Sequence, residues 1–280
     1  MVFHMEKYKI EKDSVQATLL IPLFGRKVCT EKYPLLFSDK SASGLLNSID
    51  YDFSALEKMS RKRKYMFSAL ETAMRHYDLV YEVKEYLKTH PFASIVNLGC
   101  GLDNTGRLCD NGKCKLYNID FADVIKVRNA LLPVGDRETN IVADIGDSDW
   151  YNLIDITNGA VFIAAGVFYY LTKEKALSVI GSMAQNFPNC SLIFDTANKL
   201  AVKLMVKMIK HEKINDVSAQ FHLNKAEKEL SEYVPGAKIS ARGYMLGYHN
   251  LQGVGVSGLF RFLARVGDGV MKMRIVKVEF

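Results

Sequence analysis

The alternation of strand-like and helical segments between residues 94 and 196 constrains the fold more than any other feature of the chain. Helical segments are expected at 123–132, 149–154 and 172–187. Between them stand five short apolar runs that end in Gly or Asp: SIVNLG, KLYNID, TNIVAD, AVFIAAG and SLIFD. Strands that alternate with helices favour right-handed crossovers and a parallel sheet. The sequence therefore predicts an α/β fold with a Rossmann-like, mostly parallel sheet.

The flanking segments predict helical additions to this core. Ser14 is a candidate cap for a helix that Pro22 must end or kink. Further helices are expected near residues 39–46 and over 61–88, where apolar residues recur every three or four positions. We predict one domain over 1–280, with a helical cap at 1–93, a core at 94–196, and lid helices and C-terminal strands at 197–280.

The C-terminal part carries two further signals. The run MKMRIVKVEF alternates apolar and basic residues, which is typical of an antiparallel strand. The helix expected at 199–210 has apolar residues at helical spacing: Leu200, Leu204, Met205, Met208 and Ile209. They are either the adaptable wall of a ligand pocket or ordinary core, and the sequence does not separate the two.

Composition and charge exclude several classes of protein. The net charge of +6 over 280 residues is a weak bias, and we interpret the basic run 61–64 as a solvated helix start, not as a nucleic-acid site. The longest apolar run, 161–171, is too short to span a bilayer, and the N-terminus lacks a secretory signal. Five cysteines without a CxxC pair favour reduced thiols, a cytoplasmic location and no metal site.

Three successive strand ends carry the chemistry. The first ends in Asn97-Leu98-Gly99-Cys100-Gly101, in which two glycines let the backbone pass close to a ligand. The second ends in Asp120, whose carboxylate can accept hydrogen bonds from both hydroxyl groups of a ribose. The third ends in Asp144 and Ile145, which suit the amino group and the ring of adenine. Together they predict a site for an adenosine moiety.

The glycine pattern narrows the choice of ligand. A dinucleotide loop prefers G-x-G-x-x-G, but Asn104 stands at the third glycine position and Gly106 does not fit the spacing. S-adenosylmethionine has no phosphates, so this loop suits it better than it suits a dinucleotide. A nicotinamide-dependent oxidoreductase on the same type of sheet stays open as an alternative.

The motifs together resemble the leucine carboxyl methyltransferase family, including its bacterial branch of tetracenomycin-type polyketide O-methyltransferases. The resemblance rests on VNLGCGLDNTGRLCDNGKCKLYNIDFADVIKVRNALLP, then IVADIGDSDW and FIAAGVFYYL, and is dense from Arg75 to Asp195. It implies a Rossmann-like S-adenosylmethionine-dependent methyltransferase with a mostly parallel, twisted, seven-stranded sheet, an antiparallel C-terminal strand and a helical lid.

The resemblance also implies roles for particular residues around the cofactor. Arg75 would bind the cofactor carboxylate, and Asp120 would hold the ribose. The methionine part would lie against Asn97, Gly99 and Gly101, and the adenine against Asp144 and Ile145. Ala165 stands where the family has a Glu near the cofactor amino group, so a non-catalytic member stays open as a second alternative. The loop also departs from the family's Thr-Arg at Asn104-Thr105.

The expected reaction is methyl transfer to a carboxylate or hydroxyl oxygen of a small molecule. A hydroxyl acceptor benefits from a base, whereas a carboxylate needs none. The candidates are Tyr169, Tyr170 and Asp195, although both tyrosines also suit core packing. His249 is a further candidate for the acceptor side, with Tyr244 and Tyr248. A protein carboxylate is a less favoured acceptor, and neither the acceptor nor the oligomeric state follows from the sequence.

Overall fold

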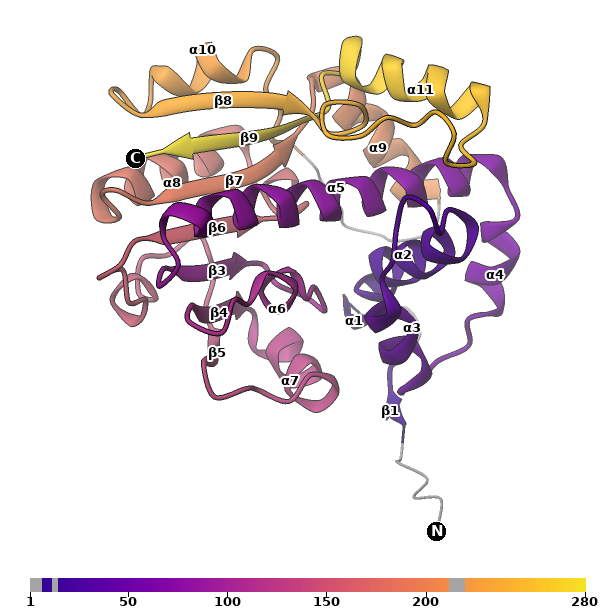
Figure 1. Cartoon of the computed structure of the whole chain (residues 1–280), viewed down its shortest axis with the longest axis horizontal. Coiled ribbons are helices and arrows are strands. Elements are labelled where there is room, and N and C mark those ends of the chain that lie inside the picture. The colour runs from indigo at the N-terminus through magenta and orange to yellow at the C-terminus, as the bar shows by residue number, and fades with distance from the viewer. Residues whose placement is uncertain (1–6, 12–14, 212–219) are drawn as a thin grey trace.

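The computed structural model describes residues 7–11, 15–211 and 220–280. A seven-stranded sheet with strand order β5-β4-β3-β6-β7-β9-β8 forms its centre (Figure 1). The strands are β3 (Ser94–Leu98), β4 (Lys115–Asp120), β5 (Glu138–Val142), β6 (Ala160–Ala164), β7 (Ser191–Thr196), β8 (Lys238–Gly243) and β9 (Arg274–Glu279). Strand β9 is antiparallel to both of its neighbours, and β3 to β7 pair in parallel. The predicted mostly parallel sheet with an antiparallel C-terminal strand is confirmed.

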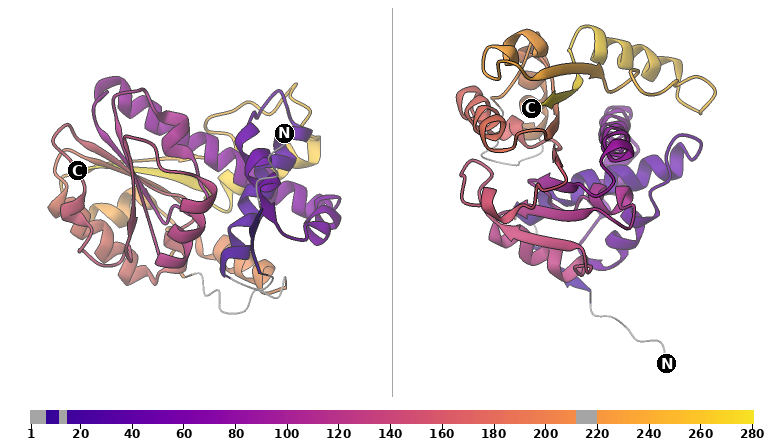
Figure 2. Two further views of the ribbon diagram at one scale, coloured as in Figure 1. Left: turned by 90° about the horizontal axis from the view of Figure 1, so that it is seen from below. Right: turned by 60° about the vertical axis from the view of Figure 1, so that its left-hand side comes forward.

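Helices cover both faces of the sheet, so its central strands are buried on both sides. One face packs against α5 (Arg63–Thr89), which contributes Leu79, Val83 and Leu87 to the core. Around the sheet also lie α6 (Thr105–Cys109), α7 (Ala122–Leu131), α8 (Lys173–Asn186) and α10 (Ala226–Ser231). Figure 2 shows the sheet between α5 on one side and α8 on the other. All five residues of strand β6 are buried, which agrees with its continuous apolar sequence AVFIA.

A group of helices lies beyond the carboxyl ends of the parallel strands (Figure 1). It contains α1 (Val15–Thr18), α2 (Leu20–Lys32), α3 (Lys40–Asn47), α4 (Ser54–Ser60), α9 (Lys199–His211) and α11 (Gly258–Gly269). A short parallel pair, β1 (Tyr8–Lys9) and β2 (Ile49–Asp50), joins the N-terminal part of this group. We call these helices the lid. The 27-residue helix α5 connects it to the sheet.

The chain breaks its first helix at the position that Pro22 imposes. Helix α1 ends at Thr18, and Pro22 lies in the first turn of α2, where a missing N–H costs nothing. Asp39 caps α3 by accepting a hydrogen bond from the Ala42 N–H, and the basic run 61–64 is exposed at the start of α5. The proposed Ser14 cap and the side chains of Met208 and Ile209 lie outside the described residues.

Several elements differ from the prediction. The segment 149–154 forms only a 3-10 turn, Tyr151–Leu153, because Trp150 and Tyr151 turn into the core beside Phe187. A second 3-10 turn, Phe168–Tyr170, follows β6. Helices α4, α6, α10 and α11 were not predicted. Helix α11 carries glycines that weaken its sequence signal, but Ser257 caps it by accepting a hydrogen bond from the Phe260 N–H.

Candidate active site

Two glycines after β3 form a turn that no other residue fits well. Gly99 and Gly101 have φ angles of +60° and +48°, in the left-handed region. A Cβ atom on Gly99 would lie 2.6 Å from Val167 Cγ2, and one on Gly101 would lie 3.2 Å from Leu19 Cδ2. The turn therefore passes closely between the segment after β6 and the lid.

Asp120 binds this turn from the neighbouring strand. Its Oδ2 accepts a hydrogen bond from the Gly101 N–H at 2.8 Å, and its Oδ1 accepts one from the Phe121 N–H at 2.8 Å. Its carbonyl accepts a hydrogen bond from the Ala143 N–H at 3.0 Å. Burial raises the pKa of Asp120 against the opposing effect of these two donors. The ends of β3, β4 and β5 therefore meet at one edge of the sheet, as predicted.

The third strand end contributes one exposed and one buried side chain. Asp144 is exposed, and its Oδ1 accepts a hydrogen bond from the Gly146 N–H at 2.7 Å. Ile145 is buried in the apolar cluster that also contains Trp150 and Phe162. Lys175 in α8 fixes the turn by donating to the Gly146 carbonyl at 2.8 Å. This segment thus presents the Asp144 carboxylate at the surface, while Ile145 packs into the core.

Asn97 and a buried arginine support the glycine turn from below. Asn97 Nδ2 donates to Asp103 Oδ1 at 3.0 Å. Arg128 in α7 donates through Nη1 to the carbonyls of Gly101 and Asp103 at 3.1 and 2.6 Å, and its Nη2 lies 3.5 Å from Glu138 Oε1. Sequence reasoning missed Arg128. The sequence feature that could have identified it is its place on the apolar face of α7, three and four positions after Ile125 and Val124.

An ion pair between the partly buried Arg75 and the buried Asp195 lies where β6 and β7 end. Arg75 Nη1 donates to Asp195 Oδ2 at 3.0 Å, and the Gly166 N–H donates to Asp195 Oδ1 at 2.5 Å. A Cβ atom on Gly166 would lie 2.8 Å from Arg75 Nη1, so the guanidinium lies directly against this turn. Ala165, just before it, packs against the core beneath α5. The structure thus brings Arg75, Ala165 and Asp195 together.

The phenols around this ion pair differ in exposure. Tyr169 is buried and hydrogen-bonded to Asp195, and burial raises its pKa well above the usual value, followed in effect by the Asp195 charge. Burial likewise raises the pKa of Tyr244, with a further contribution from Glu71. Both phenols therefore keep their protons at neutral pH. Tyr170 is 60% exposed, on the outside of the same turn.

Glu71 is a titratable group that sequence reasoning missed. It lies one helical turn before Arg75 on the same face of α5 and is half-buried. Burial raises its pKa to about 7, against the opposing charge of Arg75. A carboxyl group with this pKa can accept or release a proton near neutral pH. Its signal is an acidic residue four positions from Arg75.

The loop after β8 is tied to α5 by two side chains. His249 Nε2 lies 2.6 Å from Oδ1 of the fully buried Asp78, and the Tyr248 hydroxyl donates to Glu82 Oε1 at 2.7 Å. Asp268 accepts hydrogen bonds from the N–H groups of Met245 and Leu246. The predicted acceptor-side residues are thus divided: Tyr244 lies near Arg75, whereas Tyr248 and His249 anchor the loop.

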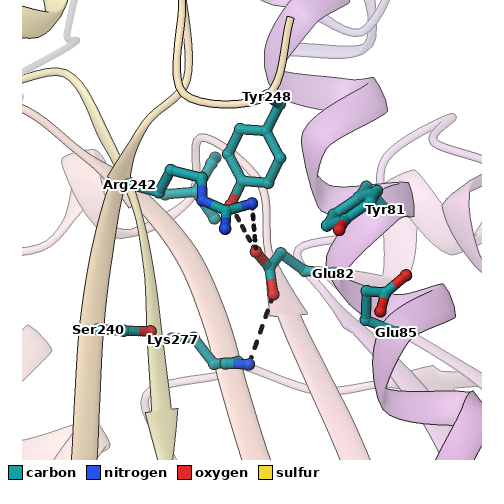
Figure 3. Close-up of a pocket in the computed structure, with 8 residues that line it drawn as sticks. Tyr81, Glu82, Glu85, Ser240, Arg242, Tyr248 and Lys277 are labelled. Atoms are coloured by element: carbon teal, nitrogen blue, oxygen red, sulfur yellow. Dashed lines mark hydrogen bonds and ion pairs between the residues drawn. The ribbon is translucent and has the colours of Figure 1, made fainter.

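A cavity of about 250 Å³ lies beside this anchor, between α5 and strands β8 and β9 (Figure 3). Glu82 is its central group, with Arg242 Nη1 at 4.0 Å and Lys277 Nζ at 3.6 Å. The Arg242 guanidinium also stacks on the Tyr248 ring at 4.6 Å. The charges in this cavity therefore neutralise one another, away from the strand ends.

The strand-end residues fit S-adenosylmethionine. The turns at Gly99, Gly101 and Gly166 leave no room for a Cβ atom, because Val167, Leu19 and Arg75 lie against them. Asp120 presents a carboxylate beside the first of these turns. Asn104, at the position of the third glycine of a dinucleotide loop, is buried. Its side chain accepts from Arg26 and donates to Ser41 Oγ. A larger, hydrogen-bonded side chain therefore takes the place of the glycine that allows close helix packing in a dinucleotide loop.

Comparison with known proteins agrees with this geometry. The sequence profile described as "Leucine carboxyl methyltransferase" matches residues 22–184. The chain belongs to the leucine carboxyl methyltransferase family. It is 26% identical over 187 residues to the tetracenomycin polyketide synthesis O-methyltransferase TcmP of Streptomyces glaucescens, covering 66% of this chain and 67% of that protein.

Solved structures share the fold of this family member. A DUF574 family protein from Streptomyces avermitilis aligns with a TM-score of 0.59 and 13% identity, over 81% of this chain and 90% of that one. The plantazolicin methyltransferase BpumL, solved with SAH, aligns with a TM-score of 0.51 and 14% identity, over 94% and 98%. The prediction of an S-adenosylmethionine-dependent methyltransferase is confirmed at the level of family and fold. Among the described residues, no helix has the length and apolar character needed to cross a bilayer.

Proposed function

We propose that this chain transfers the methyl group of S-adenosylmethionine to a carboxylate or hydroxyl oxygen of a small molecule in the cytoplasm. The observation that carries the proposal is the meeting of the Gly99–Gly101 turn, Asp120 and the Asp144–Ile145 segment at the carboxyl ends of adjacent parallel strands. The five cysteines, all free and buried, suit a reducing compartment.

Each residue has a role that follows from its position. Asp120 holds the ribose, and Asp144 with Ile145 receives the adenine. The turn around Gly99 and Gly101, supported by Asn97, lies under the methionine part. Arg75 binds the carboxylate of that part with the guanidinium nitrogens that Asp195 leaves free, because Asp195 contacts only Nη1.

The chemistry requires little from the protein beyond placement. When bound, S-adenosylmethionine supplies an activated sulfonium methyl group. The chain holds the acceptor oxygen in line with that methyl group and excludes water beneath the lid. Asp195 orients Arg75 and Tyr169, and the Tyr244 hydroxyl donates a hydrogen bond to the acceptor side. Ala165 leaves space beside Gly166 for the cofactor's amino end.

The alternatives are not favoured. A nicotinamide cofactor needs the third glycine, where Asn104 instead bonds Ser41 and Arg26. A non-catalytic role was suggested by Ala165, yet the other cofactor-side residues meet at one edge as a binding site requires.

Calorimetric titration with S-adenosylmethionine and with NADH tests the cofactor. We expect saturable binding of the first only, and no binding of S-adenosylmethionine contradicts the proposal. Incubation with methyl-labelled S-adenosylmethionine and a panel of small phenols and carboxylic acids, read by mass spectrometry, tests the transfer. Labelled methyl esters or ethers are expected, and methylamines instead would contradict transfer to oxygen.

A further inference from the structure

A buried polar cluster joins the lid to the glycine turn. Its four charged or titratable members come from separate parts of the chain. Arg26 lies in α2, Asp39 caps α3, His76 lies in α5 and Asp103 follows the glycine turn. The side chains of Arg26, Asp39 and His76 are at least nine-tenths buried. Burying an arginine costs free energy unless it is well paired, so the buried position of Arg26 calls for an explanation other than stability.

Arg26 lies over the face of the His76 ring. Its Nη1 is 3.2 Å from Nδ1 and 3.1 Å from Nε2 of the same imidazole. An atom in the ring plane at these two distances would overlap the hydrogen on the carbon between the nitrogens. Burial, and then the Arg26 charge, lower the pKa of His76, so the ring is neutral at pH 7. A neutral ring can donate through Nδ1 to Asp103 Oδ2, which lies 3.0 Å away.

Asp103 connects His76 to the glycine turn through hydrogen bonds of its own. Its Oδ1 accepts hydrogen bonds from Asn97 Nδ2 at 3.0 Å and from the Thr105 N–H at 2.8 Å. Burial raises its pKa, but His76 and Arg26 together outweigh that effect and hold it well below the usual range. The ionised Asp103 therefore fixes both the start and the end of the turn that carries Gly99 and Gly101.

The same arginine is fastened to the lid. Its Nε lies 3.4 Å from Asp39 Oδ2, and its Nη1 donates to Asn104 Oδ1 at 3.1 Å. Asn104 Nδ2 donates to Ser41 Oγ at 2.5 Å, and Ser41 donates to Asp39 Oδ1 at 2.5 Å. The N-terminus of α3 is thus connected to the turn by the Arg26–Asp39 ion pair and by the hydrogen bond from Asn104 to Ser41.

We propose that Arg26 is a positioning residue that couples docking of the lid helices α2 and α3 to the cofactor-binding conformation of the Gly99–Asp103 turn. The inference rests on the proposed function, because it assumes that this turn binds S-adenosylmethionine. In this role, Arg26 makes no direct contact with the cofactor. It acts through His76 and Asp103. Because such coupling is reciprocal, binding of the cofactor to the turn should also stabilise the docked position of α2 and α3.

Titration calorimetry on Arg26 variants tests the inference. We expect Arg26→Gln and Arg26→Lys to raise the Kd for S-adenosylmethionine by roughly 10- to 100-fold, within the usual range of coupling between sites. Lysine should not rescue binding, because a point charge cannot contact Asp39 and His76 together as a guanidinium does. Lys32→Gln is the matched control, since Lys32 is exposed in the same helix.

Two further measurements separate positioning from loss of stability. Ile49→Ala removes a buried lid side chain away from the cluster, and should lower the Tm while leaving the Kd within about twofold. In hydrogen exchange, S-adenosylmethionine should protect the amides of α2 and α3 in the wild type but not in Arg26→Gln at saturating cofactor.

The outcomes are distinct. An unchanged Kd in Arg26→Gln, or an equal rise in Ile49→Ala at the same loss of Tm, overturns the positioning role and leaves the proposed function intact. If the wild type itself does not bind S-adenosylmethionine, both proposals fail.

Discussion

At the scale of single residues, environment decides what each carboxyl group can do. Asp103 and Asp120 lie within the same strand-end region, yet the pKa of the first is lowered by His76 and Arg26 and that of the second is raised by burial. Glu71 and Asp78 lie two helical turns apart on α5, and burial raises the pKa of both to about 7. Residue type alone does not predict in which direction the pKa of each of these carboxyl groups is shifted.

Replacement of Asp120 tests the ribose site. Asp120→Ala should weaken S-adenosylmethionine binding by about 1–3 kcal/mol, because the ribose hydroxyls and the Gly101 N–H lose their acceptor. Calorimetry measures the change, and Asp136→Ala is a control at an exposed position near β5. Asp120→Asn keeps an acceptor for Gly101 and should weaken binding less. Wild-type affinity in Asp120→Ala would remove this residue from the site.

Replacement of Glu71 tests a pH dependence of stability. The folded pKa of about 7 lies above the ordinary Glu value of 4.5, so the folded state binds more protons than the unfolded state between these two pH values. The free energy of unfolding should therefore fall as the pH rises from about 4.5 to 7, by an amount on the order of 1–3 kcal/mol.

Glu71→Gln has no proton to lose, so it should remove that part of the slope and be more stable than the wild type at pH 8. Urea unfolding at pH 5 and pH 8 measures both slopes. The same slope in wild type and variant would show that Glu71 titrates normally.

At the scale of elements, the loop between β8 and α11 depends on long-range side-chain contacts. His249 and Tyr248 reach Asp78 and Glu82 on α5, more than 160 residues away along the chain. His249→Ala should destabilise the protein by about 1–3 kcal/mol, because it leaves the buried Asp78 without its partner.

The loss in His249→Ala should be larger at pH 8 than at pH 6. The His249 hydrogen bond favours the charged form of Asp78 against burial, so without it ionisation of Asp78 costs more. Chemical unfolding at the two pH values measures this, and Gln252→Ala is an exposed control in the same loop. Equal losses at both pH values would contradict the role of Asp78.

The elements also show how far local sequence specifies structure. The strands β3 to β7 were predicted because each is a short apolar run that ends at Gly or Asp. Helix α5 was predicted from its periodicity, although it begins two residues later than expected. The short helices α6 and α10 were missed because five or six residues give too little periodicity to detect, and they form where the sheet supports them.

At the scale of the whole molecule, ligand binding should stabilise the lid and the sheet together. S-adenosylmethionine at 100 times its Kd adds about 2.7 kcal/mol to stability. For a chain of this size, that corresponds to a rise in Tm of roughly 4–6 °C. Thermal unfolding with and without S-adenosylmethionine measures the shift, with NADH as the comparison. A shift with NADH alone would instead support the oxidoreductase.

By itself, the sequence determined the parallel strands β3 to β7 and the candidate residues that stand at their carboxyl ends. Parallel strands bring their carboxyl ends to one side, so the order of Gly99, Asp120 and Asp144 along the chain was enough to place them together. Only the tertiary structure decided how these groups are held. The contacts of Arg26 with His76, Arg75 with Asp195 and Asp78 with His249 join residues 50 to 171 positions apart. Local periodicity carries no information about such pairs, because they form only when helices and loops pack against one another.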